Sequence, residues 1–266
     1  MTDSDHSGLN NPVSSQFILS YPHFSTLPRH IGIIMDGNGR WAQRKKLPRV
    51  MGHRNAIRAV RETVETCAAL KIEFLTLYAF STENWLRPLE EVDFLMKLLE
   101  EFLKRELKTL MENNIRLRLI GNKDRLPDYT RKPFEKAIGE TEHNTGLTLC
   151  LAVDYGSRKE ILDACRSIAT KVRDKEISPE EIDEAVFQNY LYTAEIPDLD
   201  LIIRTSGEKR LSNFMLWQAS YAELYFTDTL WPDFNKDILF QSLSSFSERS
   251  RRMGKVVQLE GKTNEK

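Results

Sequence analysis

Short apolar runs alternate with longer amphipathic stretches along most of the chain. Residues 31–35 and 74–80 are apolar runs of strand length that contain β-branched and aromatic side chains. Between them, the apolar residues of segment 52–70 recur at helical spacing. The same pattern predicts further strands at 115–120, 147–153, 199–203 and 224–226, and further helices at 88–113, 130–143, 158–173, 179–191 and 236–251.

Strands separated by helical segments are typical of βαβ crossovers, which place parallel strands in one sheet and helices on its faces. The pattern therefore predicts an α/β fold: a single domain with a largely parallel six-stranded sheet flanked by helices. We expect the folded domain over residues 28–254. Residues 1–27 are polar and rich in Ser, Asn, Asp and Pro, which indicates a mobile N-terminal arm, and residues 255–266 are expected to form a frayed polar tail.

The charges of the chain are nearly balanced, with 38 Lys and Arg against 39 Asp and Glu. This balance argues against a generally basic nucleic-acid-binding protein. The three cysteines lie far apart without a C-x-x-C pair, which argues against a structural zinc site and a disulfide framework. The N-terminus lacks a signal-peptide pattern and no stretch reaches the ~20 apolar residues of a spanning helix. We therefore expect a cytoplasmic protein that is at most peripheral to a membrane.

Parallel sheets bind ligands at the carboxyl ends of their strands, so the residues after each strand are the candidates for chemistry. The first strand is followed by Asp36, Gly37, Asn38, Gly39 and Arg40. The two glycines let the backbone approach a ligand, and a helix or turn starting here would offer free N–H groups to an anion. A carboxylate at the mouth of such a loop can hold a divalent cation. The loop therefore predicts a polyphosphate site with Asp36 as its metal ligand.

The same loop opens a strongly basic window, because no acidic residue occurs from Gly37 to Arg61. The basic residues of the window are Arg40, Arg44, Lys45, Lys46, Arg49, His53, Arg54, Arg58 and Arg61. A solvated basic face explains residues 44–46 more simply than a binding role does. A nucleic-acid site is disfavoured because the window lacks interleaved aromatic residues apart from Trp41.

A dinucleotide site is a weaker interpretation of this loop. Gly37, Asn38, Gly39 and Ala42 approximate the G-x-G-x-x-A fingerprint. That fingerprint expects an acidic residue ~20 positions further on, at the end of the second strand. The first acid after the predicted second strand is Glu83, which is too distant, and a P-loop sequence is absent. A nicotinamide-dependent oxidoreductase therefore stays a minor alternative.

The second predicted strand is followed by an unusually polar loop. Residues 81–88 read Ser-Thr-Glu-Asn-Trp-Leu-Arg-Pro and gather hydroxyls, a carboxylate, an amide, an indole and a guanidinium. Helix capping accounts for the hydroxyls. We do not expect capping to need Asn84, Trp85 and Arg87 as well, so these three are candidates for binding or chemistry.

A second phosphate site is predicted after the strand at 199–203. Arg204 leaves the end of this strand, and Arg210 and Ser212 return toward it. Two guanidinium groups and a hydroxyl that converge on one point suit a phosphate. Further on, Glu223 lies in a mostly apolar stretch and needs a partner, for which a metal ion and an arginine fit equally well.

Five strings of the sequence resemble the cis-prenyltransferase family and, within it, the bacterial undecaprenyl diphosphate synthases. They are HIGIIMDGNGRWA at 30–42, GH at 52–53, LTLYAFSTENWLRP at 75–88, DLIIRTSGEKRLSNFMLWQ at 200–218 and YAELYFTDTLWPDF at 221–234. They occur in the family's order, and the similarity covers about residues 28–254. The resemblance implies a catalytic domain over that range, with an apolar tunnel.

The resemblance also implies the reaction. Enzymes of this family condense isopentenyl diphosphate repeatedly onto an allylic diphosphate, here expected to be farnesyl diphosphate. Each condensation creates a cis double bond, and the product is a long-chain polyprenyl diphosphate such as undecaprenyl diphosphate. A requirement for Mg²⁺ and a homodimer are implied as well.

Individual residues match positions of known role in the family. Asp36 matches the catalytic, metal-binding aspartate, and Asn84 occupies the position of the proton acceptor. Glu223 matches a second metal-linked carboxylate, in its own site or in its neighbour's. The allylic diphosphate site is matched by Gly37, Asn38, Gly39, Arg40, Trp41, Arg49 and His53. The loop between the substrates is matched by Ser81, Thr82, Glu83, Asn84, Trp85 and Arg87, and the isopentenyl diphosphate site by Arg204, Arg210, Leu211 and Ser212.

A hydrocarbon product needs an apolar tunnel. The positions that line or close the tunnel in relatives are Ala79, Ile115 and Leu147. Candidates for its wall on the long helix are Leu95, Leu98, Leu99 and Phe102, although an ordinary core explains the leucines equally well. An apolar product and the pair Trp85 and Leu86 also suggest transient contact with a membrane.

Two related functions are weaker alternatives. Trans-prenyltransferases carry D-D-x-x-D motifs on an all-helical scaffold, whereas this sequence has no Asp-Asp pair. A non-catalytic subunit of a heteromeric cis-prenyltransferase would be expected to lack Asp36, Asn84 and Arg210, which are all present. One departure from the family pattern is Asp154, which stands where relatives commonly carry Asn, at a strand end that could touch a ligand.

Overall fold

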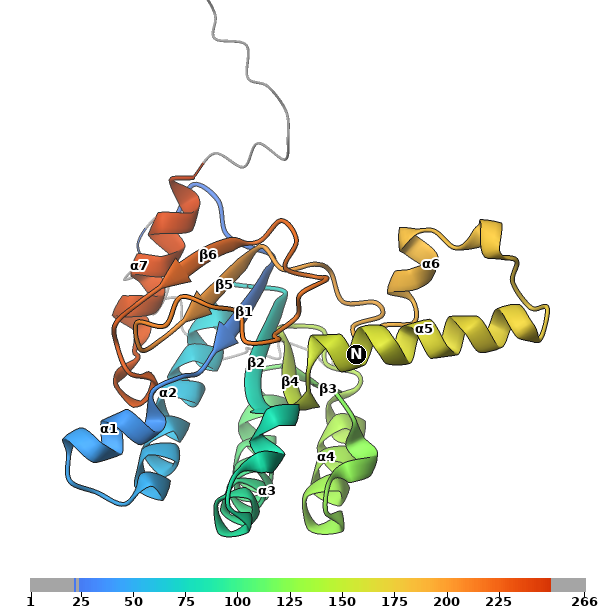
Figure 1. The fold of residues 1–266 in the computed structure, drawn as a ribbon. Helices are drawn as coiled ribbons and strands as arrows, with labels where there is room; N and C mark the ends of the chain where they lie inside the picture. Colours follow the sequence, from blue (N-terminus) through green and yellow to red (C-terminus); the bar gives the residue numbers. More distant parts are fainter. Residues whose placement is uncertain (1–21, 23, 250–266) are drawn as a thin grey trace, which may run out of the picture.

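The structure, a computed structural model, describes residue 22 and residues 24–249. Within them, parallel strands form one six-stranded sheet in the order β3-β4-β2-β1-β5-β6 (Figure 1). The strands are β1 (His30–Ile34), β2 (Phe74–Ser81), β3 (Arg116–Ile120), β4 (Thr148–Tyr155), β5 (Leu201–Arg204) and β6 (Glu223–Phe226). This arrangement confirms the predicted α/β fold with a parallel sheet flanked by helices.

The connections between the strands are mostly helical. The α-helices are α1 (Asn38–Arg44), α2 (Arg49–Ala69), α3 (Leu89–Glu112), α4 (Asp128–Thr141), α5 (Ser157–Arg173), α6 (Glu184–Gln188) and α7 (Lys236–Ser247). Short 3-10 helices are η2 (Thr82–Leu86), η3 (Lys123–Arg125), η4 (Pro179–Glu181) and η5 (Trp231–Asp233). In the part of the chain that the structure describes, no helix has the length and apolar character needed to cross a membrane.

Alternate residues of the strands point to opposite faces of the sheet, and both faces are covered. One set, which includes Ile31, Leu75 and Leu149, is buried in the larger core with residues of α2, α3, α4 and α7. The other set, which includes Cys150 and Ile202, is buried against the segment that leads into and out of β5. Burial on both faces explains why these strands read as nearly continuous apolar runs.

The prediction of one continuous helix over 179–191 is wrong. The structure has two short pieces there, η4 and α6, with an extended residue, Ile182, between them. Asp183 accepts a hydrogen bond from the N–H of Val186 (2.8 Å) and so starts α6 afresh. Short polar side chains compete with a helix in this way by bonding to nearby backbone groups.

The ends of the predicted domain fall partly outside the described residues. Most of the arm expected over 1–27 lies there, and its described end packs on α7, where the ring of Phe24 lies 6.1 Å from that of Phe240. The tail expected over 255–266 lies entirely outside the described residues. The last predicted helix is described as far as Ser247.

The register of the sheet brings three loops to one edge. Ile33 pairs with both Leu77 and Ile203, so β1, β2 and β5 run level with one another. The loops that follow these strands therefore share the carboxyl edge of the sheet. This is the edge at which a doubly covered parallel sheet binds its ligands.

Two glycines fix the first of these loops. Gly37 has a φ of 106° at the start of α1, in the left-handed region that favours glycine. A Cβ on Gly52 of α2 would lie 1.9 Å from the carbonyl oxygen of Asn38. The backbones of α1 and α2 can therefore approach this closely only because residue 52 has no side chain.

We predict that Gly52→Ala lowers the free energy of unfolding by about 2 kcal/mol or more, because the added methyl group forces the two helices apart. The matched control is Gly139→Ala in α4, where a Cβ would meet no atom within 4 Å. This control should leave stability unchanged or raise it by up to about 1 kcal/mol. Urea denaturation of both variants checks the prediction, and a Gly52→Ala protein as stable as the wild type would contradict it.

Candidate active site

A cavity of about 350 Å³ opens at the carboxyl edge of the sheet, beside helices α2 and α3. Polar residues that line it include Asp36, Asn38, His53, Asn84, Arg87 and Arg204. Apolar residues that line it include Ile57, Val60, Ala79, Leu95, Leu99 and Phe102. The cavity is therefore amphipathic.

The change from polar to apolar lining follows the direction of the elements. On α2, His53 near the start of the helix is followed one and two turns later by Ile57 and Val60. On β2, Ser81 ends the strand and Ala79 lies before it. The polar residues therefore gather at the carboxyl edge of the sheet, and the apolar residues lie deeper.

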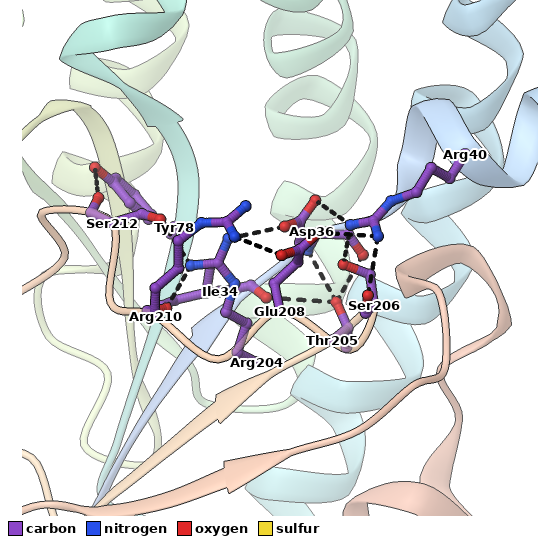
Figure 2. A network of polar contacts seen from close by, with 10 residues as sticks. All are labelled: Ile34, Asp36, Arg40, Tyr78, Arg204, Thr205, Ser206, Glu208, Arg210 and Ser212. Atoms are coloured by element: carbon purple, nitrogen blue, oxygen red, sulfur yellow. Dashed lines mark hydrogen bonds and ion pairs between the residues drawn. The ribbon is translucent and has the colours of Figure 1, made fainter.

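Asp36 is the centre of a polar network that joins the ends of β1 and β5 (Figure 2). Its carboxylate accepts a hydrogen bond from Nη2 of Arg204 (2.9 Å) and lies 3.5 Å from Nη2 of Arg40. The hydroxyl of Thr205 accepts a hydrogen bond from the N–H of Asp36 (2.9 Å) and donates one to its carbonyl (2.7 Å). Arg204, the last residue of β5, thus holds the carboxylate of Asp36, and Thr205, the next residue, holds its backbone.

The neighbouring arginines keep Asp36 ionised. Burial acts to raise the pKa of Asp36, but the hydrogen bond and charge of Arg204 and the charge of Arg40 outweigh it. The result is a pKa below the ordinary value of an aspartate. At neutral pH, Asp36 is therefore an anion at the mouth of the cavity, where 30% of its side chain is exposed.

Arg204 is almost fully buried, with 4% of its side chain exposed. Its Nη1 donates to the hydroxyl of Ser212 (2.7 Å) and to the backbone carbonyl of Arg210. Its Nε is buried without a hydrogen-bond partner. A guanidinium with an unused buried donor beside a cavity is suited to bind an anionic ligand.

The two arginines expected to converge on one phosphate do so only in part. Arg204 meets the hydroxyl of Ser212, but the guanidinium of Arg210 pairs with Glu208. Glu208 also lies 3.1 Å from Arg40. Sequence reasoning missed Glu208 as a partner, although it lies within the string that carries the resemblance.

A second group of basic residues surrounds Glu91 in the first turn of α3. The carboxylate of Glu91 lies 3.1 Å from Nε of Arg49, 3.0 Å from Nη1 of Arg87 and 3.8 Å from Nε2 of His53. Asn38 joins this group through its side-chain nitrogen, 3.2 Å from Nδ1 of His53. Sequence reasoning missed Glu91, because an acidic residue in the first turn of a helix is ordinary.

His53 is neutral in this environment. Burial and the charges of Arg87 and Arg49 lower its pKa, the charge of Glu91 opposes them, and the resulting pKa is about 4. Nε2 of His53 and Oδ1 of Asn38 are buried without hydrogen-bond partners. Both side chains line the cavity, and unsatisfied polar atoms at such a place indicate contacts with a ligand.

The loop after β2 is closed by reciprocal capping. The N–H of Ser81 donates to Oδ1 of Asn84 (3.1 Å), and the side chain of Ser81 accepts from the N–H of Asn84. The expectation that capping does not need Asn84 is therefore wrong. Both side chains also line the cavity, so the capping fixes them at its edge.

Several predicted site residues do not line the cavity. Trp41 is buried and donates from Nε1 to Asp233 (2.7 Å). Glu83 accepts a hydrogen bond from Asn213 (3.0 Å), and Leu211 packs against the second core. The others outside the lining are Gly37, Gly39, Arg40, Arg49, Thr82, Trp85, Arg210 and Glu223.

Glu223 lies apart from Asp36 within one chain. It begins β6 and pairs in register with Leu201, whereas Asp36 follows the carboxyl end of β1. This places Glu223 about 10 Å behind Ile34, the last residue of β1, and two strands, again about 10 Å, to the side. Its carboxylate lies 2.7 Å from Arg249, so the structure supplies an arginine as its partner. Among the described residues, no group of three His, Cys, Asp or Glu side chains could hold a metal ion.

The expected tunnel residues divide into two groups. Those that line the cavity are Ala79, Leu95, Leu98, Leu99 and Phe102. Ile115 and Leu147 do not line it, and both are buried just before β3 and β4, at the amino ends of these strands. The cavity of this structure therefore reaches α3 but not these two positions.

Known proteins resemble this chain in sequence and in fold. Residues 34–254 match a family described as putative undecaprenyl diphosphate synthase. An isoprenyl transferase of Bacillus subtilis is 51% identical over 230 residues, which cover 86% of this chain and 88% of the relative. A ditrans,polycis-undecaprenyl-diphosphate synthase of Micrococcus luteus, named as specific for (2E,6E)-farnesyl diphosphate, is 51% identical over 228 residues, which cover 86% and 92%.

Two solved structures are also similar to this chain in fold and in sequence. Lavandulyl diphosphate synthase of Lavandula x intermedia, in complex with dimethylallyl diphosphate, superposes with a TM-score of 0.83 at 39% identity and covers 85% of this chain and 97% of its own. A probable undecaprenyl diphosphate synthase of Campylobacter jejuni gives a TM-score of 0.72 at 36% identity and covers 87% and 100%. None of these relatives favours a dinucleotide-binding oxidoreductase. The similarity extends over nearly the whole described domain, and this chain belongs to the cis-prenyltransferase family.

Proposed function

We propose that this protein condenses isopentenyl diphosphate repeatedly onto an allylic diphosphate, with farnesyl diphosphate as starter, to give a long-chain polyprenyl diphosphate such as undecaprenyl diphosphate. The main support for this proposal is the amphipathic cavity. Its mouth presents arginine, histidine and amide groups to diphosphates, and its deeper part presents apolar side chains to a growing hydrocarbon. The Micrococcus luteus relative, named for farnesyl diphosphate, and the lavender enzyme, bound to dimethylallyl diphosphate, support diphosphate substrates.

Mg²⁺ is the metal that the family implies, and Asp36 fits it. Mg²⁺ is commonly bound by one or two carboxylates together with the phosphates of the substrate. Asp36 offers an ionised, partly exposed carboxylate at the place proposed for those phosphates. When bound there, the ion would neutralise charge on the diphosphate. Glu223 is not part of that site within one chain, so any metal role of Glu223 requires the second copy of the proposed homodimer.

The allylic diphosphate is proposed to bind at the starts of α1 and α2. His53 provides an unused Nε2 there, because its Nδ1 is bonded to the side-chain nitrogen of Asn38, and Arg49 and Arg87 provide guanidinium groups. As the allylic C–O bond breaks, negative charge grows on the departing diphosphate. Donors that are already in place stabilise that charge without reorganising, which is usually the largest contribution to such catalysis.

Isopentenyl diphosphate is proposed to bind at Arg204 and Ser212. Arg210 can join them, because 59% of its side chain is exposed and only an exposed pairing with Glu208 has to be broken. Two separate anchors hold the isopentenyl double bond beside the allylic carbon. Such positioning converts an encounter between two molecules into an effectively intramolecular step.

The new bond forms between the allylic carbon and the isopentenyl double bond, and one C2 proton is then lost. Asn84 is a poor base, and its Oδ1 already accepts a hydrogen bond from Ser81. We therefore propose that Asn84 and Ser81 position or relay the proton. Asp36 or the released diphosphate would accept it.

The assembly and its surroundings are also proposals. We infer a cytoplasmic homodimer that acts on no nucleic acid and touches a membrane transiently when it releases product. Leu86 and Leu89 flank Arg87 near the cavity mouth and are 89% and 84% exposed. An exposed apolar pair at this place suits contact with lipid.

The first of three predictions from the proposed function concerns the activity itself. Purified protein incubated with farnesyl diphosphate, isopentenyl diphosphate and Mg²⁺ in mild detergent should yield a ladder that ends in one long polyprenyl diphosphate, measured by mass spectrometry of the extracted lipid. EDTA should abolish the ladder. Asp36→Asn should lower kcat by about 100-fold or more, because it removes the anion that pairs with Arg204 and holds the metal. A folded dimer that binds farnesyl diphosphate without extending it would contradict the proposal and point to a required partner subunit.

The second prediction concerns product length. Ala79→Leu adds bulk to the apolar part of the cavity and should shorten the final product by one or more isoprene units. The control is Ala169→Leu on the exposed side of α5, which should leave the chain-length distribution unchanged. Mass spectrometry of the products of both variants measures the chain lengths. An unaltered chain-length distribution for Ala79→Leu would mean that the growing chain does not pass Ala79.

The third prediction concerns pH. Because the pKa of His53 is lowered to about 4, its proton is lost well below neutral pH and no charge disappears as the pH rises through about 6.5. The KM for the allylic diphosphate should therefore show the same pH dependence in wild type and His53→Gln from about pH 6 to about pH 8. The variant's KM should be higher throughout. A rise in KM between these values that only the wild type shows would mean that His53 binds as a cation.

A further inference from the structure

Trp85 is held outside the cavity by three neighbours. Its Nε1 donates a hydrogen bond to Oδ1 of Asp154 (2.6 Å). Its ring meets that of Phe80 edge-on, with centroids 5.0 Å apart, and the guanidinium carbon of Arg125 lies 4.8 Å from the ring centroid. Phe80 lines the cavity, whereas Trp85 does not. These contacts therefore fix the loop that contains Trp85.

Asp154, near the end of β4, combines a buried carboxylate with an unfavourable backbone conformation. Its side chain is fully buried, and its backbone φ of 47° lies in the left-handed region. Oδ2 is buried without a hydrogen-bond partner, and Nη1 of Arg125 lies 3.4 Å from Oδ1. Burial raises the pKa of Asp154, and the hydrogen bond from Trp85 and the charge of Arg125 oppose it. A buried carboxylate costs free energy that an uncharged residue here would not.

Asp154 does not line the cavity. Its partners instead form a closed set: Asp154 bonds to Trp85 and lies near Arg125, and Arg125 stacks on Trp85. Arg125 comes from η3, after β3, and Asp154 from β4. The neighbour of β2 in the sheet, β4, and the segment after β3, one strand further out, thus both contribute to holding the loop that follows β2.

We propose that Asp154 and Arg125 are positioning residues that hold η2 through Trp85 and thereby keep Ser81, Asn84 and Arg87 at the cavity. The loop depends on such tethers, because no residue of η2 is buried. A displacement of about 1 Å at a reacting site can cost about 100-fold in rate, even when the change lies far from the chemistry. The inference rests on the proposed function only for its kinetic readout.

Three variants separate the contributions. Asp154→Ala removes both the acceptor for Trp85 and the charge beside Arg125. Asp154→Asn retains an acceptor oxygen without the charge. Arg125→Gln removes the cation from an exposed side, where 48% of the side chain is accessible, so it should fold even if Asp154→Ala does not. The matched control is Arg131→Gln on α4, whose ion pairs are with Asp128 and Glu135.

The first readout is amide hydrogen exchange of residues 81–87 in the full-length protein without substrate. Exchange there should be fastest in Asp154→Ala, intermediate in Asp154→Asn and Arg125→Gln, and unchanged in Arg131→Gln. The second readout is steady-state kinetics. In Asp154→Ala, kcat should fall by about 10- to 100-fold. The KM for the allylic diphosphate should change by about threefold or less, because only Arg87 of the groups proposed to bind it is displaced, whereas Asn38, Arg49 and His53 are untouched. Asp154→Asn should restore most of kcat.

The two readouts test the positioning role of Asp154 and Arg125 separately from the proposed function. If the wild-type protein does not extend farnesyl diphosphate, the proposed function is wrong. The amide exchange of residues 81–87 would still test the positioning role. Unchanged exchange of this segment in both Asp154→Asn and Arg125→Gln overturns the proposal. Faster exchange throughout the sheet, with kcat and KM changed together, would make Asp154 a general stability residue and would overturn it as well.

Discussion

The ion pair between Arg204 and Asp36 is the contact around which the site is arranged. It joins the ends of β1 and β5, and Arg204 is buried while Asp36 reaches the mouth of the cavity. A buried guanidinium is costly unless a carboxylate and further acceptors satisfy it, which Ser212 and the carbonyl of Arg210 do here. Breaking the pair would leave a buried charge alone, so both residues must be present together.

The same principle extends to the rest of the cavity mouth. Glu91 gathers Arg49, Arg87 and His53, and Glu208 gathers Arg40 and Arg210. In the free protein these carboxylates hold the basic groups close to where diphosphates are proposed to bind. Apart from Arg210, which has to leave Glu208, the groups then need little rearrangement when a ligand arrives, which lowers the entropic cost of binding. The deeper part of the cavity is apolar because it is walled by the core-facing sides of α2 and α3.

The sheet and most of its helices could be predicted from the sequence, because strands buried on both faces read as apolar runs and the helices between them keep their period. The strings around Asp36 and Arg204 likewise indicate one carboxyl edge, and the register brings them there. What could not be predicted depends on contacts between distant segments. Nothing near Trp85 in sequence indicates Asp154 as its partner, and the basic residues around Glu91 come from α2 and from the loop between η2 and α3. The break between η4 and α6 arises from a local competition that helical periodicity does not register.

The central claim is that one cavity binds a diphosphate at its mouth and the hydrocarbon in its depth. The most direct measurement is a crystal structure of the protein with Mg²⁺ and farnesyl thiodiphosphate, an analogue whose diphosphate leaves poorly. We predict phosphate oxygens in contact with Nε2 of His53 and the guanidinium group of Arg87, with Asp36 beside the metal. The farnesyl chain should run past Ala79 toward Leu99 and Phe102. A farnesyl chain that lies on the outer surface, with the space between α2 and α3 closed, would contradict this account.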